Sequence, residues 1–129
     1  MSRSRPGGRR ASGSLTRGED FRAVYSAGGR FTSSVATVYV LLRSSSGVRL
    51  GVAAGRKIGG AVARNRIRRR IREVLGRLRP HLAQGVDVVV VPRASAGRAS
   101  FGELVSSISA ALEKAGVLNN PMGGNSDRK

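Results

Sequence analysis

The sequence has no cysteine or tryptophan, and only one histidine and seven acidic residues. The absence of cysteine excludes disulfides, thiolate zinc sites and thiol catalysis. A protein nuclease needs clustered carboxylates for metal ions, or a histidine with a partner, and little of either is present. No serine-hydrolase, zinc-protease or Walker pattern occurs. We therefore expect no autonomous active site, and a surface position for the single histidine, His81.

Long hydrophobic runs are also missing. The longest, such as VDVVVVP from Val86, are far below the roughly 18 residues that span a bilayer. The N-terminus is basic but lacks the apolar core of a secretory signal. We expect a cytoplasmic protein with no membrane association.

Positive charge is abundant. Lysine and arginine number 24 against seven acids, so the net charge is +17. Self-repulsion of this size calls for a polyanionic partner, either nucleic acid or an anionic membrane surface. Only three of these residues are lysines, which leaves 21 arginines. The planar guanidinium group of arginine donates paired hydrogen bonds to phosphate and also stacks on bases. The composition therefore favours nucleic acid as the partner.

The chain divides into one domain with two low-complexity ends. Residues 1–14 and 119–129 are rich in Ser, Arg, Gly, Asn and Pro, and we interpret them as a disordered basic arm and a disordered tail. Residues 15–118 carry the periodic patterns. They predict a helix opened by a Thr16–Glu19 capping box, strands near 31–33, 35–43 and 48–54, a helix over 60–79, a strand over 86–91 and a helix opened by a Ser100–Glu103 capping box. We expect 35–43 and 48–54 to pair as a hairpin. This order predicts a two-layer α/β sandwich.

The helix over 60–79 has two unlike faces. Ile67, Ile71, Val74 and Leu78 recur at helical spacing and predict a core-facing stripe. The stretch from Gly55 to Leu75 holds seven arginines and one lysine against a single acid. A solvated helical face mixes signs, so this arrangement predicts contact with a polyanion. The GRKIGG segment before the helix lacks nucleotide-loop spacing, and we interpret it as a plain loop.

The aromatic residues admit two interpretations. Phe21 and Tyr25 are four residues apart and share one helical face. Together with Tyr39 they are either core residues or a stacking platform for unpaired bases. A combined role, with the rings partly packed and partly offered at a groove, is equally consistent with the composition.

One motif is more specific than these patterns. The string RKIGGAVARNRIRRRIRE closely resembles the signature of the bacterial ribonuclease P protein family, K-K-x-G-N-A-V-x-R-N-R-x-K-R-x-x-R. The upstream LTRGEDFRAVYSAGG resembles that family's L-x-x-x-x-D-F-x-x-V-F/Y helix, and the resemblance covers about residues 15–116. It implies an α+β sandwich like the second domain of a small-subunit ribosomal protein. It also implies a left-handed βαβ crossover from strand 48–54 to strand 86–91.

The resemblance implies a function as well. The family's protein partners a catalytic RNA that holds the Mg²⁺ ions and removes the 5′ leader from precursor tRNA, with one protein per RNA. The positions that match the RNA-binding signature are Arg56, Lys57, Arg64, Asn65, Arg66, Arg68, Arg69 and Arg72. Those that match the leader-binding cleft are Phe21, Tyr25 and Tyr39.

The sequence departs from the family pattern at two places, and two other functions would also suit its residues. Gly60 replaces a common asparagine, and AAGRK replaces S-x-S-K-K, which removes two hydroxyls near the cleft. The same basic helix would also suit a ribosomal or other structural RNA-binding protein. A duplex DNA-binding module is a further alternative, and it predicts that duplex DNA competes as well as structured RNA.

Overall fold

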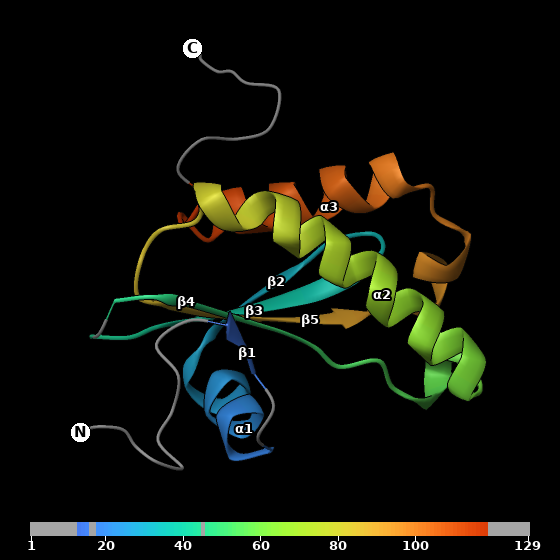
Figure 1. Ribbon diagram of the computed structural model, residues 1–129, viewed down its shortest axis with the longest axis horizontal. Coiled ribbons are helices and arrows are strands. Elements are labelled where there is room, and N and C mark those ends of the chain that lie inside the picture. The colour runs from blue at the N-terminus through green and yellow to red at the C-terminus, as the bar shows by residue number, and fades with distance from the viewer. Residues whose placement is uncertain (1–12, 16–17, 45, 119–129) are drawn as a thin grey trace.

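The computed structural model describes residues 13–15, 18–44 and 46–118. Three α-helices and a five-stranded sheet make up most of this part (Figure 1). The strands are β1 Gly13–Ser14, β2 Gly29–Thr32, β3 Ala36–Leu42, β4 Val48–Val52 and β5 Val86–Pro92. The helices are α1 Gly18–Ala27, α2 Ala61–Leu78 and α3 Phe101–Lys114, with short 3₁₀ turns η2 Arg56–Ile58, η3 Arg79–His81 and η4 Ala94–Arg98. No helix in this part of the chain has the length and apolar character needed to cross a membrane.

The helices cover the sheet unequally. Helices α2 and α3 lie together on one face, and α1 lies on the other (Figure 1). Side chains of β5 alternate between the hydrophobic clusters on the two faces of the sheet. Val88 and Val90 pack with α2 and α3, whereas Val89 packs with Val24 of α1. All three valines are fully buried. A strand covered on both faces was expected from its continuous apolar run, and that prediction is confirmed.

Helix α2 connects two parallel neighbours, β4 and β5. In Figure 1 β4 runs from left to right, α2 returns above the sheet, and β5 lies behind β4, so the crossover is left-handed. Strand twist makes right-handed crossovers the general rule. The implied left-handed crossover and the predicted mixed α+β sandwich are therefore both observed.

Two predictions about the strands are wrong. Strands β3 and β4 do not form a hairpin, because β5 lies between them in the order β1-β4-β5-β3-β2. A turn signal shows that the chain reverses, but the strand with two apolar faces must take the centre of the sheet. Gly13 and Ser14 were assigned to a disordered arm, yet they pair with Arg49 and Leu50 as β1. The buried side chain of Leu15 anchors this segment.

The helix boundaries follow the sequence signals closely. Ser100 and Glu103 form the predicted capping box: the Ser100 hydroxyl accepts from the Glu103 N–H at 3.1 Å, and the Ser100 N–H donates to the Glu103 carboxylate at 2.7 Å. The predicted Thr16 cap lies outside the described residues, as do residues 1–12 and the tail 119–129.

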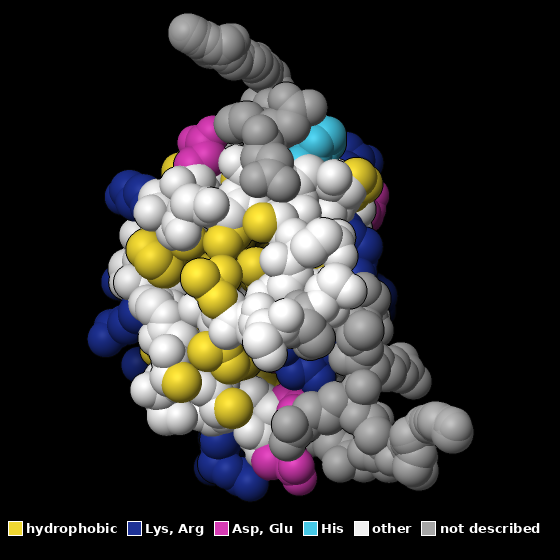
Figure 2. All heavy atoms as spheres, turned by 90° about the vertical axis from the view of Figure 1, so that its left-hand side faces the viewer, with side chains coloured by type: hydrophobic (Ala, Val, Ile, Leu, Met, Phe, Trp, Pro, Cys, Tyr) yellow, Lys and Arg dark blue, Asp and Glu magenta, His cyan; other side chains and the backbone are white. Residues whose placement is uncertain are grey.

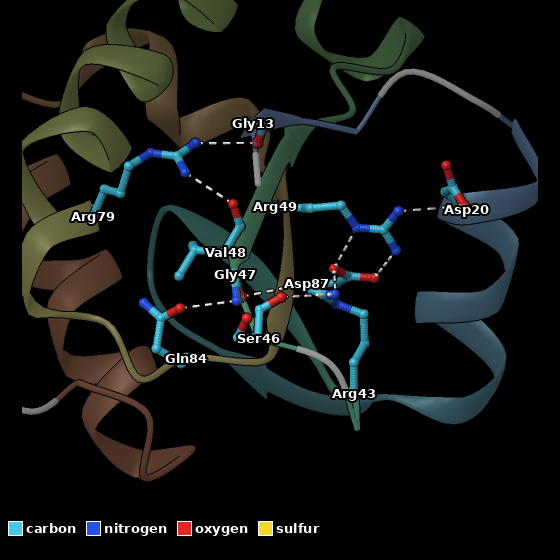
Figure 3. A network of polar contacts seen from close by, with 10 residues as sticks. All are labelled: Gly13, Asp20, Arg43, Ser46, Gly47, Val48, Arg49, Arg79, Gln84 and Asp87. Carbon is cyan, nitrogen blue, oxygen red and sulfur yellow. Dashed lines mark hydrogen bonds and ion pairs between the residues drawn. The ribbon is translucent and has the colours of Figure 1, made fainter. Parts of the chain in front are cut away.

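A polar network is buried beneath α1 (Figure 3). Arg49 of β4 and Asp87 of β5 are register partners, and the guanidinium donates two hydrogen bonds to the carboxylate at 2.8 and 2.6 Å. Arg43, after β3, approaches the same carboxylate at 2.8 Å, and Asp20 of α1 lies 3.9 Å from Arg49. The hydrogen bond with Asp87 raises the pKa of Arg49 above its ordinary value. Charged groups thus join three strands and α1 inside the protein.

Replacing Asp87 by asparagine should strongly destabilise the fold. The change removes the carboxylate that Arg49 and Arg43 share, whose side chains are only 7% and 14% exposed, and leaves Arg49 with the more distant Asp20. Breaking a buried pair on one side lowers the free energy of unfolding by about 3–5 kcal/mol. Urea denaturation at neutral pH measures this change in the free energy of unfolding.

The matched control is Glu73→Gln, which breaks the exposed Glu73–Arg77 pair of 3.2 Å. It should change the free energy of unfolding by less than about 1 kcal/mol. Equal effects of the two substitutions would contradict the role given to Asp87.

Candidate nucleic-acid interface

Helix α2 presents the two faces that its sequence predicts. Its core stripe is buried, and it comprises Ile67, Ile71, Val74, Leu75 and Leu78. Asn65, Arg69 and Arg72 are exposed on the other side, Arg66 is exposed at one edge, and Arg64 and Arg68 are half-buried. The apolar stripe therefore holds the helix while the polar groups remain available to a partner.

Most of the charge on α2 is uncompensated. Its one acid, Glu73, lies toward the C-terminal end and pairs with Arg77. Arg68 donates to the side chain of Asn65 at 2.7 Å. Arg64, Arg66, Arg69 and Arg72 make no side-chain hydrogen bond or ion pair with any described residue. Several adjacent guanidinium groups without counter-charges are a strong phosphate-binding surface.

The charge is not spread evenly over the molecule. Figure 2 views the side where the turn between β3 and β4 lies, and there hydrophobic side chains gather in the centre while basic ones lie around the rim. The arginines of α2 instead follow one helix from its first turns onward. This concentration on one element favours a specific contact surface over general solubility.

The turn that leads into α2 adds two further basic residues. Arg56 and Lys57 are exposed in η2. Gly59 then adopts a φ of 135°, which side chains disfavour, and an added Cβ would lie 3.2 Å from the Cβ of Ala63. Gly60 precedes the helix without a side-chain cap. The glycines allow the chain to turn sharply, so that η2 and the first turn of α2 lie close together.

The three predicted cleft residues form one cluster on the α1 face of the sheet. The ring centres of Phe21 and Tyr25 are 6.4 Å apart, and those of Tyr25 and Tyr39 are 4.9 Å apart in an edge-to-face arrangement. Phe21 and Tyr39 are half-buried, whereas Tyr25 has 39% of its surface exposed. The rings pack against the core and still reach solvent, so the packing half of the combined role is confirmed and base stacking stays a prediction.

The cluster also has a defined charge state. Burial, and secondarily the neighbouring Tyr39, raise the pKa of Tyr25 above its ordinary value of 10. Its hydroxyl therefore stays protonated near neutral pH. A neutral ring is compatible with the close approach of a polyanion, which a phenolate would repel.

A hollow of about 660 Å³ lies further along β3 and β5, where Thr37 and Val91 are each two residues from the register pair Tyr39 and Val89. Thr37 and Val91 line its floor, and Arg30, Lys57 and Arg93 are among its walls. Arg30 pairs with Tyr39 across β2 and β3, so the two side chains lie next to each other on one face. An unpaired strand would find rings for its bases and cations for its phosphates along this path.

Arg30 and Arg93 were not predicted as site residues. Their proximity to Tyr39 and Lys57 depends on the register of β2, β3 and β5, which no local motif specifies. Ala53 stands where the family pattern has serine, and it packs against the same buried residues as Phe21 and Tyr39. The departure therefore begins on the same face of the sheet as the predicted cleft residues.

The predicted residues form two surfaces. The arginines of α2 and the aromatic cluster lie on opposite faces of the sheet (Figure 1). The turn η2 joins them, because Lys57 lines the hollow and Gly60, shortly after it, begins α2. Among the described residues, no group of three or more histidines or carboxylates could hold a metal ion.

The chain combines a small mixed sheet, three helices and a concentrated arginine surface, which would suit a polyanionic partner. Comparisons with known proteins narrow the class. A family model described as ribonuclease P matches residues 10–116. A ribonuclease P protein component from Symbiobacterium thermophilum is 40% identical over 99 residues, which cover 76% of this chain and 86% of that protein.

Solved structures agree with the sequence matches. The Staphylococcus aureus RNase P protein superposes with a TM-score of 0.73 at 28% identity, covering 82% of this chain and 97% of that one. The RNase P protein from Thermotoga maritima gives a TM-score of 0.70 at 26% identity, covering 78% and 94%. The chain belongs to the bacterial ribonuclease P protein family, and its role lies in tRNA processing.

Proposed function

We propose that this chain is the protein subunit of a ribonuclease P holoenzyme, an endoribonuclease that removes the 5′ leader of precursor tRNA. In this proposal α2 and η2 bind the catalytic RNA through Arg56, Lys57, Arg64, Asn65, Arg66, Arg68, Arg69 and Arg72. The cleft formed by Phe21, Tyr25 and Tyr39 binds the single-stranded leader. One protein serves one RNA in the cytoplasm.

The main support for the proposal is that arginines without counter-charges and partly exposed aromatic rings lie on opposite faces of the sheet. Unpaired arginines on α2 suit the phosphates of a folded RNA. Partly exposed rings on the other face suit unstacked bases, which RNA-binding proteins recognise by stacking. A protein that contacts two RNAs at once, one folded and one single-stranded, needs both surfaces.

The protein's contribution to the reaction is then binding and charge neutralisation. Arginines lower the repulsion between phosphates of the catalytic RNA, and the cleft adds affinity only for RNA that still carries its leader. Precursor therefore binds more tightly than mature tRNA. No side chain of the protein is assigned a proton transfer or a nucleophilic step.

In this proposal the catalytic RNA and the precursor tRNA bind the Mg²⁺ ions. The acids of the described chain that lie near basic groups are already engaged, because Asp87 and Asp20 neighbour Arg49 and Glu73 pairs with Arg77. When bound, the ions supply the activated water and stabilise the leaving oxygen. The arginines support this role indirectly by lowering the repulsion between phosphates of the catalytic RNA.

A reconstitution experiment tests the proposal. Purified chain is added to a bacterial ribonuclease P RNA and a precursor tRNA at low Mg²⁺, where phosphate repulsion is least screened. Leader removal should rise well above that of RNA alone, and a mature tRNA should compete poorly. No gain over RNA alone, together with co-sedimentation with ribosomal particles, would favour a structural RNA-binding protein instead.

Arg69→Ala and Arg72→Ala should each weaken binding to the RNA subunit and reduce its salt dependence. Each lost phosphate contact lowers the slope of log affinity against log salt by roughly 0.7–0.9. Filter binding across a salt series measures the slope. Lys114→Ala, which removes one exposed positive charge from α3, is the matched control and should leave the slope unchanged. Unchanged slopes for both arginine variants would show that these groups only face solvent.

Tyr25→Ala should reduce selectivity for precursor over mature tRNA. Loss of one stacking contact weakens binding of the precursor by about 1–3 kcal/mol, while binding of mature tRNA should stay the same. Tyr25 is preferable to Phe21 for this test, because Phe21 lies so close to Gly51 that a Cβ there would meet its ring at 2.9 Å.

A thermal melt of Tyr25→Ala excludes loss of folding, and Tyr25→Phe should retain the selectivity. Equal weakening of the binding of precursor and mature tRNA would show that this cleft does not bind the leader.

A further inference from the structure

A second hollow lies on the other side of η2, at the first turn of α2. Its volume is about 540 Å³, within the usual range of roughly 300–1,000 Å³ for ligand sites. Ile58, Val62 and Ala63 give it an apolar surface, Arg66 and Arg70 stand beside them, and Gly97 of η4 closes it. None of the residues that line it is acidic.

Val62 is the unusual residue of this hollow. It has 83% of its surface exposed, more than the other large apolar side chains that reach solvent in the described chain. The core does not use it, and a β-branched residue gains nothing from a helical position. Its exposure therefore fits a contact with a partner better than a contribution to folding.

The two arginines are arranged differently. Val62, Arg66 and Arg70 recur at intervals of four, so they form one stripe along α2. The guanidinium of Arg70 donates to the carbonyl of Ala99 at 2.6 Å and lies 3.5 Å from that of Ala96. Arg70 thereby fastens η4 to α2 and holds the wall of the hollow in place. Arg66 is exposed, and its side chain makes no hydrogen bond or ion pair with any described residue.

From these features we infer that the hollow binds an unpaired nucleobase of the catalytic RNA. An extruded base has an apolar face that packs on Ile58 and Val62, and arginine planes stack on bases while their N–H groups reach the adjoining phosphate. The charge suits a nucleotide, because the charged residues that line the hollow, Arg66 and Arg70, are both cationic. The catalytic RNA is the source, since the hollow lies on α2 and the leader cleft lies across the sheet. This inference rests on the proposed function.

The first test separates base contact from phosphate contact. Val62→Ser should weaken binding of the catalytic RNA about tenfold, since it removes most of one apolar contact. The slope against salt should stay at its wild-type value, because no phosphate contact is lost. Val62→Ile should bind as the wild type does. A wild-type affinity for Val62→Ser, or a reduced slope, would overturn the inference.

The matched control is Leu42→Ser. Leu42 is the last residue of β3, 69% exposed, and it lies at the opposite end of the sheet from α2's first turn. It should bind the RNA as tightly as the wild type, and an equal loss would show that Val62→Ser acts non-specifically. Thermal melts of both variants should match the wild type, because both side chains are mostly exposed.

The second test identifies the base. A photo-crosslinking diazirine residue at position 62 should label one unpaired nucleotide of the catalytic RNA. An abasic replacement there should weaken binding by the same factor as Val62→Ser, and the two changes together should cost no more than either alone. Labelling confined to the leader or spread over paired helices, or additive effects, would overturn the inference. If the wild-type chain itself does not bind this RNA, the proposed function fails instead.

Discussion

A buried ion pair between two parallel strands sets the geometry of this protein. Arg49 and Asp87 face each other across β4 and β5, and both are buried where they form two hydrogen bonds. A shift of either strand by one residue would send one of these charges to the other face of the sheet, into the core under α2 and α3. The pair therefore penalises every alternative register. Because α2 connects these two strands, their register also limits where the arginines of α2 can lie.

The basic helix is stable only because its core face is orderly. Adjacent like charges on α2 oppose folding, and the described acids compensate little of them. Burial of five apolar side chains offsets that repulsion. A polyanion that binds the folded state alone would add further stability by mass action. Under the proposed function, binding of RNA and stability of the fold would be coupled, since both depend on how the same guanidinium charges are screened.

Local patterns predicted the helices and the central strand well. The stripe from Ile67 to Leu78 and the capping box at Ser100 specify α2 and α3 because both signals are contained in a few neighbouring residues. The pairing of β3 with β4 was predicted wrongly, since strand order depends on distant segments. Arg49 and Asp87 carry no local signal either, because a charge in an apolar strand reads as a solvent-facing residue until its partner is known. The same reason explains why Arg30 was missed beside Tyr39.

The short turn η2 contributes residues to two hollows of the protein. Consecutive residues of η2 face different hollows, Lys57 toward the aromatic side and Ile58 toward the first turn of α2. The strand β4 ends just before this turn, and Gly59 allows the chain to reverse into the helix. Any displacement of η2 would therefore alter both hollows at once. If the two surfaces bind two RNAs as proposed, the covalent geometry and the packing of this one turn would set the distance between them.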